Sequence, residues 1–465
     1  MGDIVVCGGG VIGLAAAAML VRDGHRVTVL EADPAEVPAT AGAAWESWQR
    51  KGVAQFRQPH NLFPGFRRVC DAELPEVTGR LLAAGCVWED PVAVLPPSLT
   101  DHDPRPGDET LAFATGRRPA IEYTIASLAA EQPGLEVRRG VRVTGLTRGP
   151  DAIAGVPHVT GVVTSEGDEI GADLVVDATG RRTAMADLLA ALGARRPQTE
   201  SEDCGFAYYT RYFSGPALPA RIGPPILPIG TITLLTLPGD SGTWSVTVFA
   251  AGGDAPLKEL RHVDTFSRVV RACPLQAHWL DGEPVTDVLP IAGIMDCYRR
   301  FVVDGEPIAT GFAAVGDAWA CTNPSAGRGI SVGALHAQLL RQTVRDRLGD
   351  PAGFARAWDE RTEAMLAPHY RNQISADRIR LAQMDALRAG REPPPDDSFA
   401  AGLLAAANTD PDAFRAFLEI AFCLALPDEV RERPGMREKA ERARHEPQQP
   451  APGPDRRQLL RLLAQ

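Results

Sequence analysis

The chain has 465 residues, which is enough for about two or three domains. Its apolar and charged fractions are those of a globular protein, and a net charge of −11 argues against nucleic acid or an anionic membrane surface as the main partner. Eight scattered cysteines show no CxxC pair and no zinc spacing, so we expect reduced thiols, no metal site and a cytoplasmic location. No basic segment precedes the first strand, so we expect no signal peptide.

The first predicted unit is a strand, a glycine turn and a helix. A short apolar run is followed by Gly-Gly-Gly-Val-Ile-Gly at residues 8–13 and then by a helix-like apolar run. This order is typical of a dinucleotide-binding fold. Gly8 permits the tight turn, Gly10 lets the backbone approach a pyrophosphate, and Gly13 lets helix and strand pack closely.

A second predicted strand, residues 26–30, ends in Glu31. An acid at about 20 residues past the glycines can bind both hydroxyls of an adenosine ribose, and it disfavours a 2′-phosphate. The helix N-terminus after Gly10 offers free N–H groups and a positive dipole end to the pyrophosphate. The glycines alone would also fit an ordinary turn in an α/β domain, but together with the strand, the helix and Glu31 they predict nucleotide binding.

The next elements alternate between helices and strands. We expect an amphipathic helix capped by Gly85, a proline-rich loop, a second helix, a strand pair and a hairpin turn at residues 165–169. A buried strand then ends in the turn Asp177-Ala178-Thr179-Gly180. The expected bounds are 69–84 and 117–132 for the helices, and 135–139, 141–146, 161–164 and 172–177 for the strands.

Between about residues 200 and 300 the pattern becomes antiparallel, with short alternating strands that could roof a substrate pocket. A return to strand, glycine turn and helix follows. The expected elements are a strand at 206–213, a hairpin of 231–237 and 243–250, a strand and turn at 313–317, a loop at 323–329 and a helix at 330–347.

The C-terminal part is predicted to be mostly helical, with a proline- and glutamine-rich flexible tail over 446–465. The helix that contains residues 413–426 is apolar on much of its circumference. It could close the pocket or pair with another subunit, so a monomer and a homodimer both remain open. The expected helices are 354–366, 370–388, 399–407 and 411–426.

Three separated motifs, residues 8–13 with Glu31, 177–180, and 316–317 with 324–329, together resemble FAD-dependent enzymes of the para-hydroxybenzoate hydroxylase structural class. The segment Gly-Val-Ala-Gln-Phe-Arg-Gln-Pro-His at 52–60 is similar to the branch of polyether-type flavin epoxidases and related hydroxylases, as is Arg118-Pro119. The resemblance implies an α/β fold. Its expected parts are a Rossmann-like FAD-binding domain of the GR2 type (1–195 and 300–350), an antiparallel-sheet substrate domain (196–299) and a helical C-terminal region (351–445).

The resemblance also implies which residues bind FAD. Asp317 stands where the family's acid binds the ribityl chain, and a carboxylate suits sugar hydroxyls. The helix that follows residues 324–329 points its N-terminus at the flavin ring in this family, where a positive dipole end stabilises the reduced form. The expected cofactor-binding residues are Gly8, Gly10, Val11, Ile12, Gly13, Glu31, Arg57, Arg118, Val143, Ala178, Thr179, Gly180, Gly316, Asp317, Pro324, Gly327, Gly329 and Ile330.

Further residues are candidates for the cofactor and substrate pocket. Arg57 and Arg118 occupy places where related enzymes contact the cofactor phosphates or the flavin, although an arginine in an arginine-rich protein can also be a solvated surface residue. His60, Tyr209 and Arg211, together with the neighbouring Tyr208, could line the substrate site; the alternative is a structural histidine and a buried aromatic strand.

The resemblance implies a monooxygenase of secondary metabolism that inserts one oxygen atom of O₂ into a small organic substrate, by hydroxylation or epoxidation through a flavin C4a-hydroperoxide. Aromatic hydroxylases of the class carry an Asp-Gly pair followed by Ser and Arg near the second glycine turn, whereas this chain has Asp177-Ala178-Thr179-Gly180-Arg181-Arg182-Thr183. The electron source is therefore either NAD(P)H directly or a partner flavin reductase.

Two other functions use the same scaffold. An FAD-dependent dehydrogenase or reductase of an unsaturated, lipid-like substrate would carry the same glycine motifs, and so would a flavin-binding redox sensor. Halogenation is disfavoured, because no lysine occurs between Lys51 and Lys258 and the Trp-x-Trp-x-Ile-Pro signature is missing.

Overall fold

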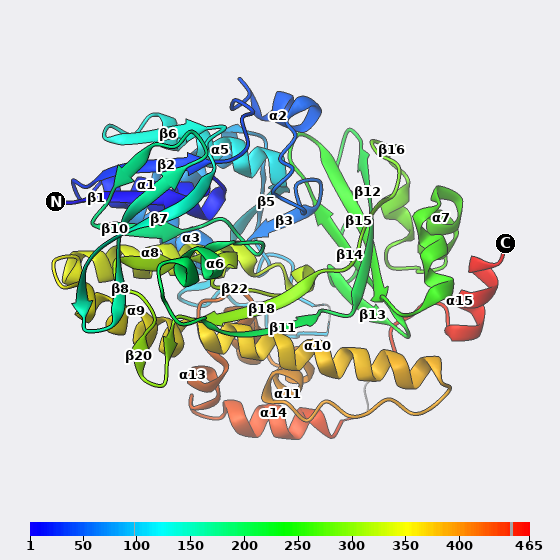
Figure 1. The fold of residues 1–465 in the computed structure, drawn as a ribbon. Coiled ribbons are helices and arrows are strands. Elements are labelled where there is room, and N and C mark those ends of the chain that lie inside the picture. Colours follow the sequence, from blue (N-terminus) through cyan, green and yellow to red (C-terminus); the bar gives the residue numbers. More distant parts are fainter. Residues whose placement is uncertain (97, 447–449) are drawn as a thin grey trace.

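The structure is a computed structural model that describes residues 1–96, 98–446 and 450–465 (Figure 1). A five-stranded parallel sheet with the strand order β21-β10-β1-β2-β6 lies on the left of Figure 1, and we call it the central sheet. Val6 lies opposite Val29 and Val176 on the two neighbouring strands, and these strands are apolar on both faces because both faces are covered. The strands are β1 (Asp3–Cys7), β2 (Arg26–Glu31), β6 (Leu135–Arg139), β10 (Leu174–Asp177) and β21 (Phe312–Ala314).

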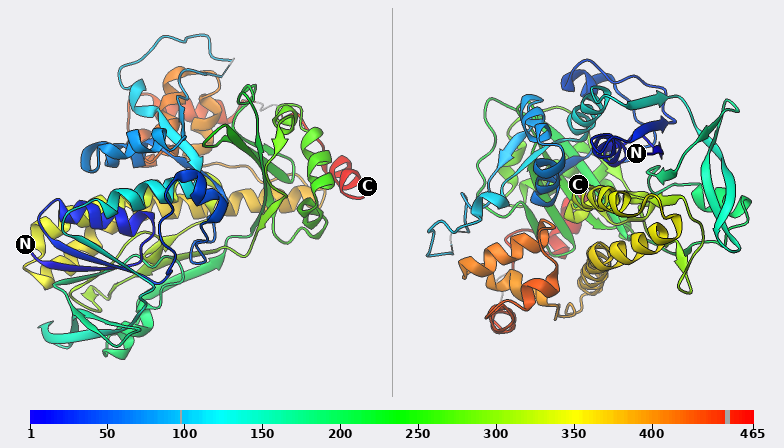
Figure 2. Two further views of the ribbon diagram at one scale, coloured as in Figure 1. Left: turned by 90° about the horizontal axis from the view of Figure 1, so that it is seen from above. Right: turned by 90° about the vertical axis from the view of Figure 1, so that its left-hand side faces the viewer.

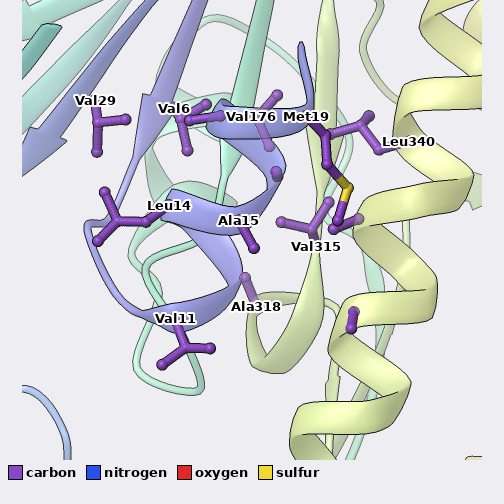
Figure 3. Packing of buried hydrophobic residues seen from close by; sticks show 14 of the residues in the cluster. Val6, Val11, Leu14, Ala15, Met19, Val29, Val176, Val315, Ala318 and Leu340 are labelled. Atoms are coloured by element: carbon purple, nitrogen blue, oxygen red, sulfur yellow. The ribbon is translucent and has the colours of Figure 1, made fainter. Parts of the chain in front are cut away.

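Helices α1 (Val11–Val21) and α5 (Arg118–Ala130) pack against this sheet, and α8 (Gly329–Arg347) packs against α1. The α1 helix is buried on nearly all sides, which agrees with its uniformly apolar sequence. Its run of four alanines lets the neighbouring helices approach closely. Figure 3 shows Met19 of α1 next to Leu340 of α8, with the strand residues Val6, Val29 and Val176 along the other side of the helix.

The strand pair expected after residue 134 is not formed as predicted. Residues 135–139 form β6, which pairs in parallel with β2 and so belongs to the central sheet. Gly140, at φ +78, turns the chain away before the next strand. A separate antiparallel sheet follows, with the predicted hairpin at 165–169: β7 (Val143–Ile153), β8 (Val156–Thr164) and β9 (Glu169–Gly171).

The larger antiparallel sheet stands beside the parallel one and contains the predicted hairpin (Figure 1). One face is covered by α7 (Val263–Arg271) and the other by α10 (Ala367–Arg388), whose Leu381 and Met384 reach Phe249. The strands are β12 (Phe206–Ser214), β13 (Ile226–Ile229), β14 (Ile232–Pro238), β15 (Thr243–Ala251), β16 (Glu283–Pro284) and β17 (Leu289–Ile291).

Smaller sheets connect these two layers. The sheet of β3, β4 and β5 contacts the β14–β15 hairpin, where Arg117 and the buried Asp240 form a bidentate ion pair at 2.6–2.9 Å. The remaining strands are β3 (Pro59–Leu62), β4 (Val87–Glu89), β5 (Phe113–Arg117), β11 (Gln198–Asp203), β18 (Met295–Arg300), β19 (Val302–Val303), β20 (Glu306–Pro307) and β22 (Ala320–Cys321).

Two predicted helices are shorter than expected. The helix expected at 69–84 is broken into α3 and α4, because Pro75 lacks a backbone N–H and disfavours helical geometry at Leu74. The helix expected at 411–426 ends at Ala421. The other helices are α2 (Ala41–Ser47), α3 (Pro64–Glu73), α4 (Glu76–Ala83), α6 (Met185–Ala191), α9 (Pro351–Met365), α11 (Phe399–Ala406), α12 (Pro411–Ala421), α13 (Pro427–Arg431) and α14 (Met436–Arg444).

The flexible tail predicted for 446–465 is wrong for its last part; residues 447–449 lie outside the described residues. Helix α15 (Arg456–Leu463) has a capping box at Asp455, and its Leu459 and Leu463 are buried against the α7 side of the large sheet. Figure 2 shows α15 at the end of the molecule opposite the N-terminus. The helix is ordered because its leucines are buried, although the residues that precede it are polar. The domain bounds given above stay predictions.

The apolar face of α12 is covered within the same chain. Leu418 and Phe422, the residue after the helix, pack with Phe63, Leu111 and Phe113.

Candidate active site

One cavity of about 500 Å³ runs along the carboxyl ends of β1, β10 and β21 and continues beneath the large antiparallel sheet. Ligands of doubly wound folds bind at this edge of the parallel sheet. The three glycine-bearing segments that are far apart in the sequence all line this cavity. The predicted cofactor residues along its wall are Gly8, Gly10, Val11, Ile12, Gly13, Glu31, Arg118, Val143, Ala178, Thr179, Gly180, Gly316, Asp317, Pro324, Gly327, Gly329 and Ile330.

The first glycine turn has the geometry that a ligand against the backbone requires. Gly8 has φ +110, and a Cβ there would lie 2.4 Å from the carbonyl oxygen of Ala178. A Cβ at Gly13 would lie 2.1 Å from the carbonyl oxygen of Gly8, so strand and helix touch at this point. A Cβ at Gly10, in contrast, would meet no atom within 4 Å, so open space lies beside the backbone there.

Two helix N-termini meet at the cavity. The first residues of α1 and of α8 line it, and neither helix has a side chain that caps its N-terminus. Ile12 of α1 lies against Gly316 and Gly333, so the two helix ends are close together. The uncapped N–H groups and the positive dipole ends favour an anionic ligand such as a pyrophosphate. The residues present therefore fit the cofactor that the resemblance implies.

Glu31 is held by the protein at the end of the cavity that contains the first glycine turn, which we call the nucleotide end. Its Oε2 accepts from the backbone N–H of Gly9 and from Arg50 Nη2, both at 2.8 Å, and its Oε1 accepts from the backbone N–H of Asp33. A carboxylate has about four acceptor positions, so it retains capacity for a ribose hydroxyl.

Arg50 is a site residue that the sequence reasoning missed. Its side chain is 3% exposed, lines the cavity and also lies 3.6 Å from Glu122. Two of its nitrogens, Nε and Nη1, have no hydrogen-bond partner among the described residues. An arginine close before the 52–60 segment was the available signal, but only the fold shows that it reaches Glu31.

The two acids of the other glycine turns differ. Asp177 is engaged within the protein: its carboxylate accepts from the Thr179 hydroxyl at 2.6 Å and from the Thr183 hydroxyl at 2.5 Å. The carboxylate of Asp317 lines the cavity and accepts no hydrogen bond from the described residues. Burial raises the pKa of Asp317, and nearby arginines, among them Arg118, lower it. Of these two acids, Asp317 is therefore the one that is available to a ligand.

Arg118 and His60 form a rigid pair in the cavity wall. Arg118 donates to Glu122 at 2.8 Å and approaches His60 Nε2 at 3.3 Å, while His60 Nδ1 lies 2.9 Å from the carbonyl oxygen of Gln58. Burial, followed by the charge of Arg118, lowers the pKa of His60 to about 3. The ring is therefore neutral, with the Nδ1 hydrogen donated to Gln58, and it is a fixed wall rather than a titrating base.

Beneath the large sheet, the cavity wall consists of strand side chains instead of glycine turns. Tyr208, Leu235, Thr247 and Ile291 line the cavity from the strands. The predicted candidates Tyr209 and Arg211 do not line it, and this correction has a simple cause: side chains alternate along β12. Tyr209 belongs to the cluster on the far face, and Arg211 donates to Thr286 and stacks on Phe213. Tyr208 is the pocket residue of the strand.

Arg57 also lies away from the cavity. Its guanidinium stacks on Trp45 with 4.6 Å to the ring centre and donates to the carbonyl oxygen of Trp45. Arg117 stacks on the same ring at 4.2 Å. Trp45 thus holds together the segment before β3 and the β5 strand, and the structure gives Arg57 a contact in this interface instead of a place on the cavity wall.

Membrane-spanning helices and metal clusters are both absent from the described residues. No described helix combines the length and the apolar character needed to cross a lipid bilayer. No group of three or more His, Cys, Asp or Glu side chains in the described ranges could hold a metal ion.

Comparisons with known proteins agree with this geometry. Residues 6–71 match the family model of the NAD(P)-binding Rossmann-like domain. The Mycobacterium tuberculosis protein Rv3254 is 26% identical over 362 residues, which cover 74% of this chain and 73% of that protein.

Among solved structures, PqsL, a probable FAD-dependent monooxygenase from Pseudomonas aeruginosa, has a TM-score of 0.61 at 17% identity and covers 83% of this chain and 98% of its own. OxyS, the anhydrotetracycline hydroxylase from Streptomyces rimosus, has a TM-score of 0.57 at 18% identity, covering 91% and 76%. The predicted fold class, an α/β fold with a Rossmann-like domain, is confirmed, because the chain shares the fold of these two solved structures.

Proposed function

We propose that this protein is an FAD-dependent monooxygenase that transfers one oxygen atom of O₂ to a small organic substrate, by hydroxylation or epoxidation. The observation that carries the proposal is the single cavity on which all three glycine turns converge and which then continues beneath the large antiparallel sheet. Its nucleotide end has room for a long anionic cofactor, and its far end adds strand and helix side chains that a cofactor alone does not need.

The residues divide the work by position. Gly10 and the N-terminus of α1 would bind the pyrophosphate of FAD, and the N-terminus of α8 would face its flavin ring. Glu31 and Arg50 would hold the ribose end, and Asp317 would accept from the ribityl hydroxyls. When bound, FAD supplies the redox chemistry with O₂.

The far end of the cavity positions the substrate and excludes water. Tyr208, Leu235, Ile291 and Tyr370 provide mostly apolar surface. Gln58 and Thr247 add polar atoms: the Thr210 hydroxyl donates to Gln58 Oε1 at 2.7 Å and lies 2.8 Å from the Thr247 hydroxyl. The substrate we propose is therefore a largely apolar molecule with few polar groups.

The electrons come from NAD(P)H, either directly or through a partner flavin reductase. Asp177, the acid of the second glycine turn, is fully buried and accepts from Thr179 and Thr183 instead of lining the cavity, which supports a departure from the hydroxylases that bind NAD(P)H at this turn. Mixing the FAD-loaded protein with NADH or NADPH without air decides between the two. Rapid bleaching of the flavin would exclude an obligatory reductase, and an unbleached flavin would support one.

Isotope labelling tests the reaction itself. With ¹⁸O₂ and a converted substrate, a monooxygenase places one ¹⁸O atom in the product. A product free of ¹⁸O would contradict the proposal and favour the dehydrogenase or reductase alternative.

We also propose that the enzyme works in the reducing cytoplasm on a small-molecule substrate, without nucleic acid or membrane. Each of the eight cysteines is a buried free thiol, and the net charge is −11.

A further inference from the structure

A buried polar cluster supports the loop of residues 322–329, which forms one wall of the cavity and leads into α8. Asp296 of β18 accepts a hydrogen bond from the backbone N–H of Asn323 through Oδ1, at 2.6 Å. The hydroxyl of Tyr208 donates to Asn323 Oδ1. The loop is thus held on one side by a carboxylate and by a cavity-lining tyrosine.

Helix α10 holds the same loop from its own side. Gln373 Nε2 donates to Ser325 Oγ at 3.4 Å and to Asp377 Oδ1 at 2.9 Å. Arg328 Nη2 donates to the other end of the same amide, Gln373 Oε1, at 2.6 Å. Asp377 therefore fixes the orientation of Gln373, and Gln373 fixes two residues of the loop.

The charges of this cluster are not balanced. Asp296 is 2% exposed and Asp377 is 7% exposed, yet neither forms an ion pair among the described residues. Asp377 Oδ2 is buried without a hydrogen-bond partner in the described part of the chain. Arg328, the nearby cation, donates to Gln373 instead of to either carboxylate. Two buried carboxylates without a bound cation disfavour each other's ionisation.

We propose that Asp296 and Asp377 are positioning residues for the cofactor-facing loop and that they hold one proton between them. With the proton present, both acids keep Asn323, Ser325 and Gln373 in place. When the proton leaves, two negative charges remain in a buried site, the loop loosens, and FAD binds more weakly. The inference rests on the proposed FAD site only in this last consequence.

The electrostatic surroundings of Asp296 and Asp377 also favour a retained proton. Burial raises the pKa of Asp296 to about 7, and the charge of Asp377 adds to the rise. Burial raises the pKa of Asp377 to about 6, against the lowering effect of its hydrogen bond from Gln373. Other titratable or charged groups face the pair from each neighbouring element: Glu202 and Asp203 on β11, Cys204 after it, Tyr208 on β12, Cys297 on β18, Arg328 on the loop and Tyr370 on α10.

The raised pKa values determine how the stability of the fold depends on pH. A carboxyl group whose pKa is raised on folding stabilises the fold at low pH, and this contribution is lost as pH rises through the folded pKa. For Asp296 and Asp377 the loss extends from their ordinary range up to about pH 7. Asparagine resembles the protonated acid, so Asp296→Asn and Asp377→Asn should not lose stability over this range.

The test measures the unfolding temperature of the flavin-free protein from about pH 5 to pH 9 for the wild type, both single variants and the double variant. Asp187→Asn, which changes an exposed acid, is the matched control. We expect the wild type and the control to lose stability toward high pH in parallel, and the double variant to lose less and to exceed the wild type at the highest pH. Variants that are equally destabilised at every pH would show a merely structural role and overturn the proposal.

A titration of FAD into the same flavin-free samples tests the consequence for the site. In the wild type we expect the dissociation constant to rise about tenfold between slightly acidic and alkaline pH, and in the double variant less than about twofold. Equal pH dependence in both would contradict the proposal. Absence of FAD binding at every pH would contradict the proposed function, whereas the unfolding series would still decide the shared proton.

Because a variant can fail to fold, the wild type also provides a direct measurement. The infrared band of a protonated carboxyl group should persist at neutral pH and disappear at alkaline pH. Its absence at neutral pH would overturn the proposal.

Discussion

The nucleotide end and the substrate end of the cavity are built in different ways. The nucleotide end consists of glycine turns, backbone N–H groups and helix N-termini at the edge of a parallel sheet. The substrate end consists of side chains from β12, β14, β15, β17 and α10. A site made of backbone needs particular residue types at fixed spacing, whereas a site made of side chains depends on which face of a strand points inward.

Because the two ends are built differently, substitutions in them should have different effects. Substitutions at the nucleotide end should weaken cofactor binding when they fill the space beside the backbone or change a charge. Changes at the substrate end should act only when they fall on the inward face. The ion pair between Arg117 and Asp240 connects the two parts of the fold, and we call it the joint. Breaking it should lower the free energy of unfolding of the whole protein.

The largest effect is expected at this joint. Arg117→Met removes the partner of Asp240, which is 1% exposed and would remain as a buried unpaired carboxylate. We expect a loss of about 3–5 kcal/mol in the free energy of unfolding. Arg138→Met breaks an exposed ion pair with Glu136 and should cost about 0–1 kcal/mol. Denaturant unfolding measures both, and similar small losses in the two variants would contradict the account of the joint.

The next effect concerns the nucleotide end. Asp317→Asn removes the charge of the one acid in the three glycine turns that lacks a protein donor among the described residues. The loss of charged hydrogen bonds to the cofactor should weaken FAD binding by about 10- to 100-fold. Fluorescence titration with FAD measures this. An unchanged dissociation constant would remove Asp317 from the site.

The smallest effect is expected from a comparison of two neighbouring tyrosines of β12, which face opposite sides of the strand. Tyr208→Phe removes the hydroxyl that donates to Asn323, beside the cofactor-facing loop, and should weaken FAD binding by about three- to tenfold. Tyr209→Phe alters the opposite face of β12 and should leave the dissociation constant unchanged. Equal effects of the two substitutions would show that the face assignment is wrong.

The sequence predicted the glycine turns at the nucleotide end of the cavity because the requirements of such turns are local. Gly8, Gly180, Gly316 and Gly327 all have positive φ, and only glycine adopts such geometry freely. The strand–turn–helix order around them is visible within short windows. The fold class, the large hairpin and the strand at 172–177 follow from the same local patterns.

The rest required the tertiary structure. The alternation of β12 shows that Tyr208 and Tyr209 face opposite ways, but only the packing of α10 shows which face is inside. Arg50 reaches Glu31 across the fold, and Arg57 is captured by Trp45. Strand β6 joins the central sheet by pairing with β2, a long-range choice that no local pattern records.

The central claim is that three distant glycine turns form one FAD site. It is tested most directly by titrating FAD into flavin-free wild type, Gly10→Glu and Gly42→Glu while recording the visible spectrum. A glutamate at Gly10 would fill the open space beside the backbone with a negative charge, whereas Gly42 lies on α2 outside the cavity. We expect saturable FAD binding by the wild type and by Gly42→Glu, and none by Gly10→Glu. A wild type that takes up no FAD, or a Gly10→Glu variant that binds it as tightly as the wild type, would contradict the claim.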